Sequence, residues 1–329
     1  MSMLQFYAFR IMQRDGDFNI ILRAGELSQL IVDVFAKIET DRLNHLRTKQ
    51  EQLRAASYTA LRDAVETDGD VRNVGQLVVL PSSFTGGHRY MHEKCQDAMT
   101  YVKHHGAPDL FIIMTCNPNW PEITSELLPG QTLKDRNDLI ARVFRLKVQT
   151  FMFLVDTQNI YGIKRCHVYT IEWQKRGLPH VHFLSWMVAL YRRRSPEDGG
   201  AETTIGRFHV DTRWVIPYSP FLSRTFDSHV NVEYCRSICA LKYLMAYLNK
   251  GKDKAVVGLA NLHRNEEITR YQIARYISTN EGIWRILQFP IHDHFPAVEQ
   301  LQVHLENGQR TLLTLKTRQH VQQNLLLRR

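Results

Sequence analysis

The feature that most constrains the fold is the segment KRCHVYTIEWQKRGLPHVHFLSWM, residues 164–187. It consists of two runs rich in β-branched and aromatic residues, joined by a basic, glycine-bearing turn at Lys175–Gly177. Two such runs separated by a few residues that include glycine predict a β-hairpin, in which the two strands are antiparallel. The segment therefore favours an antiparallel sheet at the centre of the fold.

Helix-like and strand-like segments alternate around this hairpin. Residues 25–66 lack proline and carry apolar residues at helical spacing, which predicts two or three amphipathic helices. The other segments predict strands at 76–81 and 109–117, helices at 82–106 after a turn and at 138–156, a strand followed by a helix within 228–251, and an exposed loop at 191–206. Together they predict an α+β fold with a mainly antiparallel central sheet, flanked by helices and preceded by a helical N-terminal segment.

The composition is that of a folded, basic protein. Of the 329 residues, 44% are hydrophobic, which is enough to form a core, and the net charge of +9 raises nucleic acid as a partner. No run of about 18 apolar residues occurs, so we expect no membrane partner. The five cysteines are mostly scattered, which suits a reducing compartment.

Two histidines, His180 and His182, occupy alternate positions in the second run of the hairpin, so both imidazoles face the same side of the sheet. Two imidazoles on one side of a strand can bind one divalent ion if a third ligand is supplied. Glu172 and Gln174 share a face of the preceding strand. A three-residue turn places Glu172 directly opposite His180, whereas a four-residue turn places Trp173 there. The alternative is that both histidines are ordinary surface residues of a strand, and the hairpin alone leaves this open.

A second pattern lies in CALKYLMAYLNKG, residues 239–251. Its aliphatic residues form one apolar stripe at helical spacing, whereas Tyr243, Tyr247 and Lys250 fall on nearly the opposite side. A phenol can attack phosphorus when its proton is removed and a metal neutralises the charge of the phosphate. The alternative is an exposed amphipathic helix whose tyrosines are surface aromatics.

The two patterns together resemble the HUH endonucleases of the two-tyrosine type: H-x-H preceded by EWQKRG and followed by Y-x-x-x-Y-x-x-K. Within that superfamily the chain is similar to the replication-initiator (Rep) domain of Helitron rolling-circle transposases, also called the Helitron helicase-like domain. The resemblance runs over nearly the whole chain, including VLPSSFTGGHRYMHEKCQDAM (79–99), GAPDLFIIMTCNPNWPEI (106–123) and RYISTNEGIWRILQFPIH (275–292). It implies an HUH/Rep-type core.

The resemblance also implies an activity, the nicking and rejoining of single-stranded DNA at transposon ends. His180 and His182 would bind Mg²⁺ or Mn²⁺ against the scissile phosphate, with Glu172 or Gln174 as the third ligand.

The resemblance assigns the covalent chemistry to the tyrosines. Tyr243 would attack and leave a 5′-phosphotyrosine and a free 3′-OH, and Tyr247 would serve the second strand transfer. DNA contacts are expected from Lys175, Arg176, Lys250, Lys252 and Asn117, although Asn117 is also explained as a turn-forming residue before Pro118.

The resemblance further implies the organisation of the chain: a helical N-terminal region at 1–70, an HUH endonuclease domain at 71–290, and a C-terminal tail at 291–329. In relatives this tail leads to a helicase domain; no G-x-x-x-x-G-K-[ST] occurs here, so we expect that domain to be absent and no ATP hydrolysis. We expect the protein in the nucleus.

Two departures from the family favour alternative functions. Ala246 stands where relatives carry a lysine between the tyrosines, and the stretch that follows the H-x-H strand is shorter than in relatives. These departures favour a truncated relic that binds DNA through a basic groove without cutting it. A third possibility is a metal phosphodiesterase that uses water, in which the tyrosines would be dispensable.

Overall fold

The computed structural model describes most of the chain, namely residues 1–50 (except 15, 17 and 24), 79–174, 177–187, 195–211, 219–235, 267–272 and 277–299. Two compact units are distinguished, Met1–Pro296 and Ala297–Arg329. Only residues 297–299 of the second unit are described, so the fold below is that of the first. No described helix is long and apolar enough to cross a membrane.

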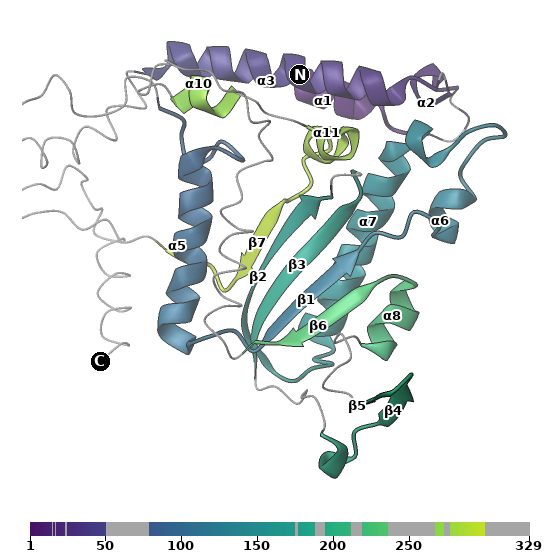
Figure 1. Ribbon diagram of the computed structural model, residues 1–329. Helices are drawn as coiled ribbons and strands as arrows, with labels where there is room; N and C mark the ends of the chain where they lie inside the picture. Colours follow the sequence, from purple (N-terminus) through teal and green to yellow (C-terminus); the bar gives the residue numbers. More distant parts are fainter. Residues whose placement is uncertain are drawn as a thin grey trace, which may run out of the picture. The chain divides into compact units, whose positions relative to one another are not determined.

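A five-stranded sheet forms the centre of this unit, in the order β6-β1-β3-β2-β7 (Figure 1). All neighbouring strands in it are antiparallel. The strands are β1 (Leu110–Thr115), β2 (Lys164–Trp173), β3 (Pro179–Met187), β6 (Val230–Tyr234) and β7 (His292–Phe295). Together with the surrounding helices, this sheet confirms the predicted α+β class and the predicted hairpin.

One face of the sheet packs on the hydrophobic core. Because side chains alternate along a strand, every second residue of β1, β2, β3 and β6 points to this face. Helix α7 (Asn137–Met152) covers it, with the Phe151 ring 5.3 Å from the ring of Phe183 on β3. The buried sheet residues of this face include Ile112, Met114, Ile171, Val181 and Val232. The opposite face carries the two histidines of β3.

The N-terminal helices α1 (Met3–Arg10), α2 (Ile20–Arg23) and α3 (Leu27–Thr48) belong to the same core. Helix α11 (Thr279–Ile286) packs against both α3 and α7. Gly282 allows the close approach of α11 to α3, since a Cβ atom at this position would lie 3.0 Å from Cγ2 of Ile31. Figure 1 shows α11 between α3 and the end of the sheet.

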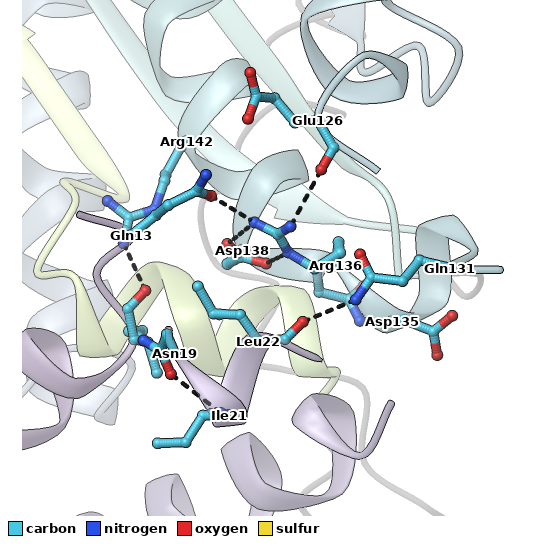
Figure 2. Close-up of polar contacts among 12 residues, drawn as sticks. Gln13, Asn19, Ile21, Leu22, Glu126, Gln131, Asp135, Arg136, Asp138 and Arg142 are labelled. Carbon is cyan, nitrogen blue, oxygen red and sulfur yellow. Dashed lines mark hydrogen bonds and ion pairs between the residues drawn. The ribbon is translucent and has the colours of Figure 1, made fainter. Parts of the chain in front are cut away.

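A buried ion pair lies at the start of α7, and its arginine also bonds to the N-terminal region. The guanidinium of Arg136 donates two hydrogen bonds to the carboxylate of Asp138, at 2.9 and 3.0 Å, and both side chains are almost fully buried (Figure 2). Arg136 also donates to Oε1 of Gln13 at 3.0 Å and to the carbonyl oxygen of Glu126 at 3.3 Å. Removal of one partner would leave a buried charge uncompensated, which is strongly destabilising.

The turn of the hairpin is held by α11. Gly177 has a φ of +83°, a conformation that side-chain-bearing residues rarely adopt. Its N–H donates to the carbonyl oxygen of Gln174 at 2.7 Å, and its own carbonyl accepts from Nδ2 of the buried Asn280 at 2.7 Å. The ring of Trp173, at the end of β2, meets the ring of Trp284 edge-on at 6.1 Å. Helix α11 thereby fixes the end of the hairpin that lies next to the histidines.

The other elements are short or lie at the periphery, apart from α5 (His88–His105), which packs on the β7 side of the sheet (Figure 1). They are α6 (Pro121–Thr124), α8 (Pro220–Phe226), α10 (Glu267–Gln272), the 3₁₀ turns Leu133–Asp135 and Pro196–Asp198, and a π-helical turn, Phe153–Thr157. Strands β4 (Glu202–Ile205) and β5 (Phe208–Asp211) form a separate two-stranded sheet.

Three details differ from the expectations. The strand predicted at 76–81 is wrong for its described part, because the side-chain amide of Gln50 bonds both the N–H and the carbonyl of Val79. The loop predicted at 191–206 contains the exposed strand β4. Strand β7 lies within the predicted tail and pairs with β2. The domain boundaries at residues 70 and 290 stay predictions.

The contact between α11 and α3 at Gly282 generates a stability prediction. We expect Gly282→Val to lower the free energy of unfolding by about 1–3 kcal/mol, because the added methyl groups overlap Ile31. Urea denaturation would measure the change. Ala36→Val, on the exposed side of α3, is the control and should cost no more than about 0.7 kcal/mol. Equal losses in the two variants would contradict the close packing.

Candidate metal centre

The register of the hairpin decides which side chains face one another. On β2 and β3, Glu172 lies opposite His180, Thr170 opposite His182, and Trp173 opposite Pro179. The register is therefore the one expected for the three-residue turn. Side chains directly opposite each other on an antiparallel pair share one face of the sheet. Glu172 consequently lies on the same face as both imidazoles.

The three side chains converge through particular atoms. Oε2 of Glu172 lies 3.6 Å from Nε2 of His180 and 3.6 Å from Nε2 of His182. The two imidazole rings are nearly perpendicular, with centroids 4.5 Å apart. One ligand atom from each residue can be chosen so that all three lie within 4.8 Å of one another. Ligand atoms that each bind one ion at about 2.1 Å are separated by roughly 3–3.5 Å, so this spacing is close to that of a metal site.

The surroundings hold the imidazoles in place. The side chain of His182 is only 2% exposed, and its ring stacks on Phe111 of β1 with centroids 5.8 Å apart. His180 is 14% exposed, and its buried Nε2 atom has no hydrogen-bond partner. A buried polar atom without a partner costs free energy, which a cation bound at this nitrogen would offset. The donor set of two imidazoles and a carboxylate fits a divalent ion.

Gln174 was the other candidate for the third ligand. Its Nε2 atom lies 3.4 Å from Nδ1 of His180, on the opposite side of the ring from the nitrogen that faces Glu172. Gln174 is also exposed, beyond the end of β2. The geometry favours Glu172 as the third ligand, with Gln174 placed to orient the His180 ring.

Strand β6 adds polar residues to this face that the sequence reasoning missed. Asn231 lies opposite Ile113 and Glu233 opposite Phe111, so both share the face of His182. Nδ2 of Asn231 donates to Oε1 of Glu233 at 3.0 Å. The segment VNVEY does indicate this face, because its polar residues alternate with valines, as on a strand with one buried face.

The structure brings together only some of the predicted site residues. Tyr243, Tyr247, Lys250, Lys252, Lys175 and Arg176 lie outside the described residues, and their roles stay predictions. Asn117 is described: its Nδ2 donates to the carbonyl oxygen of Asp227 at 2.7 Å, and its Oδ1 accepts from the N–H of Asn119 at 2.9 Å. These bonds are those of a turn-forming residue, and its contact with DNA stays a prediction.

Comparison with known proteins adds one match. A family model described as "Helitron helicase-like domain at N-terminus" matches residues 6–185, which is more than half of the chain. Glu172, His180 and His182 all lie inside the matched region, near its end. No curated protein matches the chain.

The arrangement of the three side chains generates a metal-binding prediction. We expect Mn²⁺ to bind the chain and raise its melting temperature; a ligand at 100 times its Kd adds about 2.7 kcal/mol of stability. Glu172→Gln keeps the shape of the side chain but removes the charge, so we expect the affinity to fall at least tenfold. Differential scanning calorimetry would measure the melting temperature, and isothermal titration calorimetry the affinity.

The comparison variant is Gln174→Ala, which removes a contact that orients the His180 ring; we expect it to lower the affinity for Mn²⁺ about tenfold, and by less than Glu172→Gln, because Gln174 faces the other nitrogen of His180. A larger loss for Gln174→Ala than for Glu172→Gln would make Gln174 the third ligand. A wild-type chain that binds no Mn²⁺ would contradict the metal centre itself.

Proposed function

Because the chain belongs to the family of Helitron helicase-like N-terminal domains, we propose that it nicks and rejoins single-stranded DNA at transposon ends by tyrosine attack, as an HUH-type endonuclease. The observation that carries this proposal is the convergence of Glu172, His180 and His182 within the family region. Membership in a Helitron transposase family already implies interaction with DNA. The cleavage chemistry and the identity of its residues are the proposal.

In this proposal the metal ion has one chemical role, which concerns the charge of the phosphate. Mg²⁺ or Mn²⁺, held by the two imidazoles and the carboxylate, would neutralise charge on the scissile phosphate. The nearly complete burial of His182 and its stacking on Phe111 keep its ring in one orientation. Gln174, next to Nδ1 of His180, limits the rotation of the second ring. The ligands are therefore positioned before DNA arrives, which avoids a reorganisation cost during the reaction.

The covalent step is assigned to Tyr243. Its phenol loses a proton, its oxygen forms a bond to phosphorus, and the bond from phosphorus to the 3′ oxygen breaks. The products are a 5′-phosphotyrosine and a free 3′-OH, and Tyr247 takes the equivalent part in the second strand transfer. Because the phosphotyrosine bond conserves the energy of the diester, rejoining requires no ATP.

The binding of the strand is assigned mainly to basic residues near these groups. In the sequence, Lys175 and Arg176 lie between Glu172 and His180, and Lys250 and Lys252 follow the tyrosines. Cationic side chains bind DNA through its phosphates, so this binding should weaken as the salt concentration rises. We propose that the protein acts in the nucleus, together with a helicase domain such as relatives carry.

Denaturing electrophoresis after incubation with a labelled single-stranded oligonucleotide and Mn²⁺ tests the proposal. We expect the label to migrate with the protein, as a covalent adduct that Tyr243→Phe reduces at least a hundredfold, because phenylalanine has no nucleophilic oxygen. Tyr161→Phe is the matched control and should leave the adduct unchanged, since Tyr161 is buried in the hydrophobic core.

The other outcomes separate the alternative functions. Cleaved DNA without a protein adduct would indicate hydrolysis by water, and Tyr243→Phe would then retain activity. Salt-sensitive binding without cleavage under either cation would indicate a DNA-binding relic. Either result would overturn the proposed nicking by tyrosine.

A further inference from the structure

A large cavity lies apart from the metal centre. It has a volume of about 850 Å³ and is lined by residues of α1, α3, α5, α11 and β7, the segment before α5 and the connection from α11 to β7. Cavities that bind small organic molecules usually measure about 300–1,000 Å³. This cavity is therefore large enough for a nucleotide.

Two arginines line the cavity, one from each of two packed helices. Arg285 of α11 is fixed, since its Nε donates to Oε1 of Glu281 at 2.9 Å and its Nη1 to the carbonyl of Thr85 at 3.3 Å. Arg42 of α3 is exposed, and its guanidinium lies 5.2 Å from the centre of the Phe84 ring. No carboxylate among the described residues lies within ion-pair distance of Arg42. Its charge is thus available to an anion.

The charges around Arg42 also favour an anion. Partial burial of its guanidinium lowers the pKa of Arg42; the nearby Tyr271 hydroxyl raises it, and the positive charge of Arg285 lowers it again. The acidic residues of the lining have other partners: Glu39 accepts a hydrogen bond from Tyr271, and Asp41 lies 3.4 Å from Lys37. A phosphate at the two arginines would relieve their repulsion with a bidentate contact that guanidinium groups favour.

The rest of the lining suits a base rather than a small inorganic ion. The half-buried ring of Phe289 lines the cavity, together with the small exposed parts of the buried Phe35 and Phe84. Its polar part includes Tyr90 and His292, joined by a 2.9 Å hydrogen bond between the hydroxyl and Nδ1. Burial raises the pKa of Tyr90 to about 12 and lowers the pKa of His292 to about 3, so both are uncharged at neutral pH. Stacking on aromatic rings is the usual contact of nucleobases in single-strand binding sites, and uncharged polar groups beside the ring do not repel the phosphates.

The cavity reaches the face of the sheet that carries the metal centre. His292 on β7 pairs with Thr170 on β2, which pairs with His182 on β3, so the three side chains form one row on one face. Neighbouring strands are about 4.8 Å apart, so the backbones of His182 and His292 are roughly 10 Å apart. The metal centre and the cavity therefore lie on the same face of the sheet, two strands apart, although Thr170 and His182 between them are buried.

We propose that this cavity binds one nucleotide of the single-stranded DNA that is held at the metal centre, with a phosphate at Arg42 and Arg285 and a base against the aromatic rings. The assignment of the ligand to DNA, rather than to a free nucleotide, rests on the proposed function. The cavity makes the N-terminal helices part of the DNA-binding surface.

Fluorescence anisotropy with a labelled 20-nucleotide strand in EDTA tests this site without the metal centre. We expect Arg42→Gln to weaken binding about tenfold and to reduce the slope of log affinity against log salt by about 0.7, which corresponds to one lost phosphate contact. Arg42→Lys keeps the charge but loses the planar fork, so its affinity should be intermediate. Arg10→Gln is the matched control, since Arg10 is exposed at the end of α1 and does not line the cavity; its affinity should equal that of the wild type.

Equal affinities of Arg42→Gln and Arg10→Gln would overturn the proposal. The mononucleotide dAMP distinguishes the source of the phosphate: if Arg42→Gln weakens the binding of dAMP but not of the oligonucleotide, the ligand is a free nucleotide and the assignment to DNA is wrong. Failure of the nicking proposal is distinguished from failure of the cavity proposal, because adduct formation is measured in Mn²⁺ and strand binding is measured in EDTA. Loss of binding in Arg42→Gln without any adduct in the wild type would support the cavity and reject the nicking.

Discussion

The pairing of β2 with β3 in a single register brings together the three ligands of the candidate metal centre. A slip by one residue would move the side chains of one strand to the other face, place Trp173 opposite His180 and remove the carboxylate. The register is held where the hairpin turns, by the left-handed backbone of Gly177 and its bond to Asn280. Since Asn280 belongs to α11, which packs on α3 and α7, the geometry of the ligands depends on helices from both ends of the described chain.

The two faces of the sheet divide structure from chemistry. The face under α7 is apolar and supplies the core, whereas the other face carries His180, His182, Glu172, Asn231 and His292. An antiparallel sheet can leave one face partly solvated, so these polar groups need not all be buried. His182 is nevertheless almost fully buried, so it is not an ordinary surface histidine. A cation bound to the imidazoles would offset the free-energy cost of burying their polar atoms.

The two faces of the sheet could be predicted from the sequence where polar and apolar residues alternate regularly. The prediction failed where a single contact determines the local structure. The alternation in residues 164–187 predicted the hairpin and the shared face of the histidines, but the turn length, and hence Glu172 opposite His180, could not be read from it. Strand β7 was missed because HDHF is short and polar and is stabilised by its pairing with β2. The strand expected at 76–81 fails at Val79 because a distant amide, that of Gln50, satisfies its backbone. Contacts between residues far apart in the sequence leave no local pattern.

The N-terminal helices, which the sequence placed outside the endonuclease domain, have two physical connections to its chemistry. Helix α3 supports α11 through the contact at Gly282, and α11 supports the hairpin turn through Asn280. The same pair of helices supplies Arg42 and Arg285 to the cavity beside β7. A substitution between α3 and α11 would therefore act on both the hairpin turn and the separation of the two arginines. If the two sites bind a cation and a DNA strand as proposed, we expect their binding to be coupled through this helix interface, although the sites share no side chain.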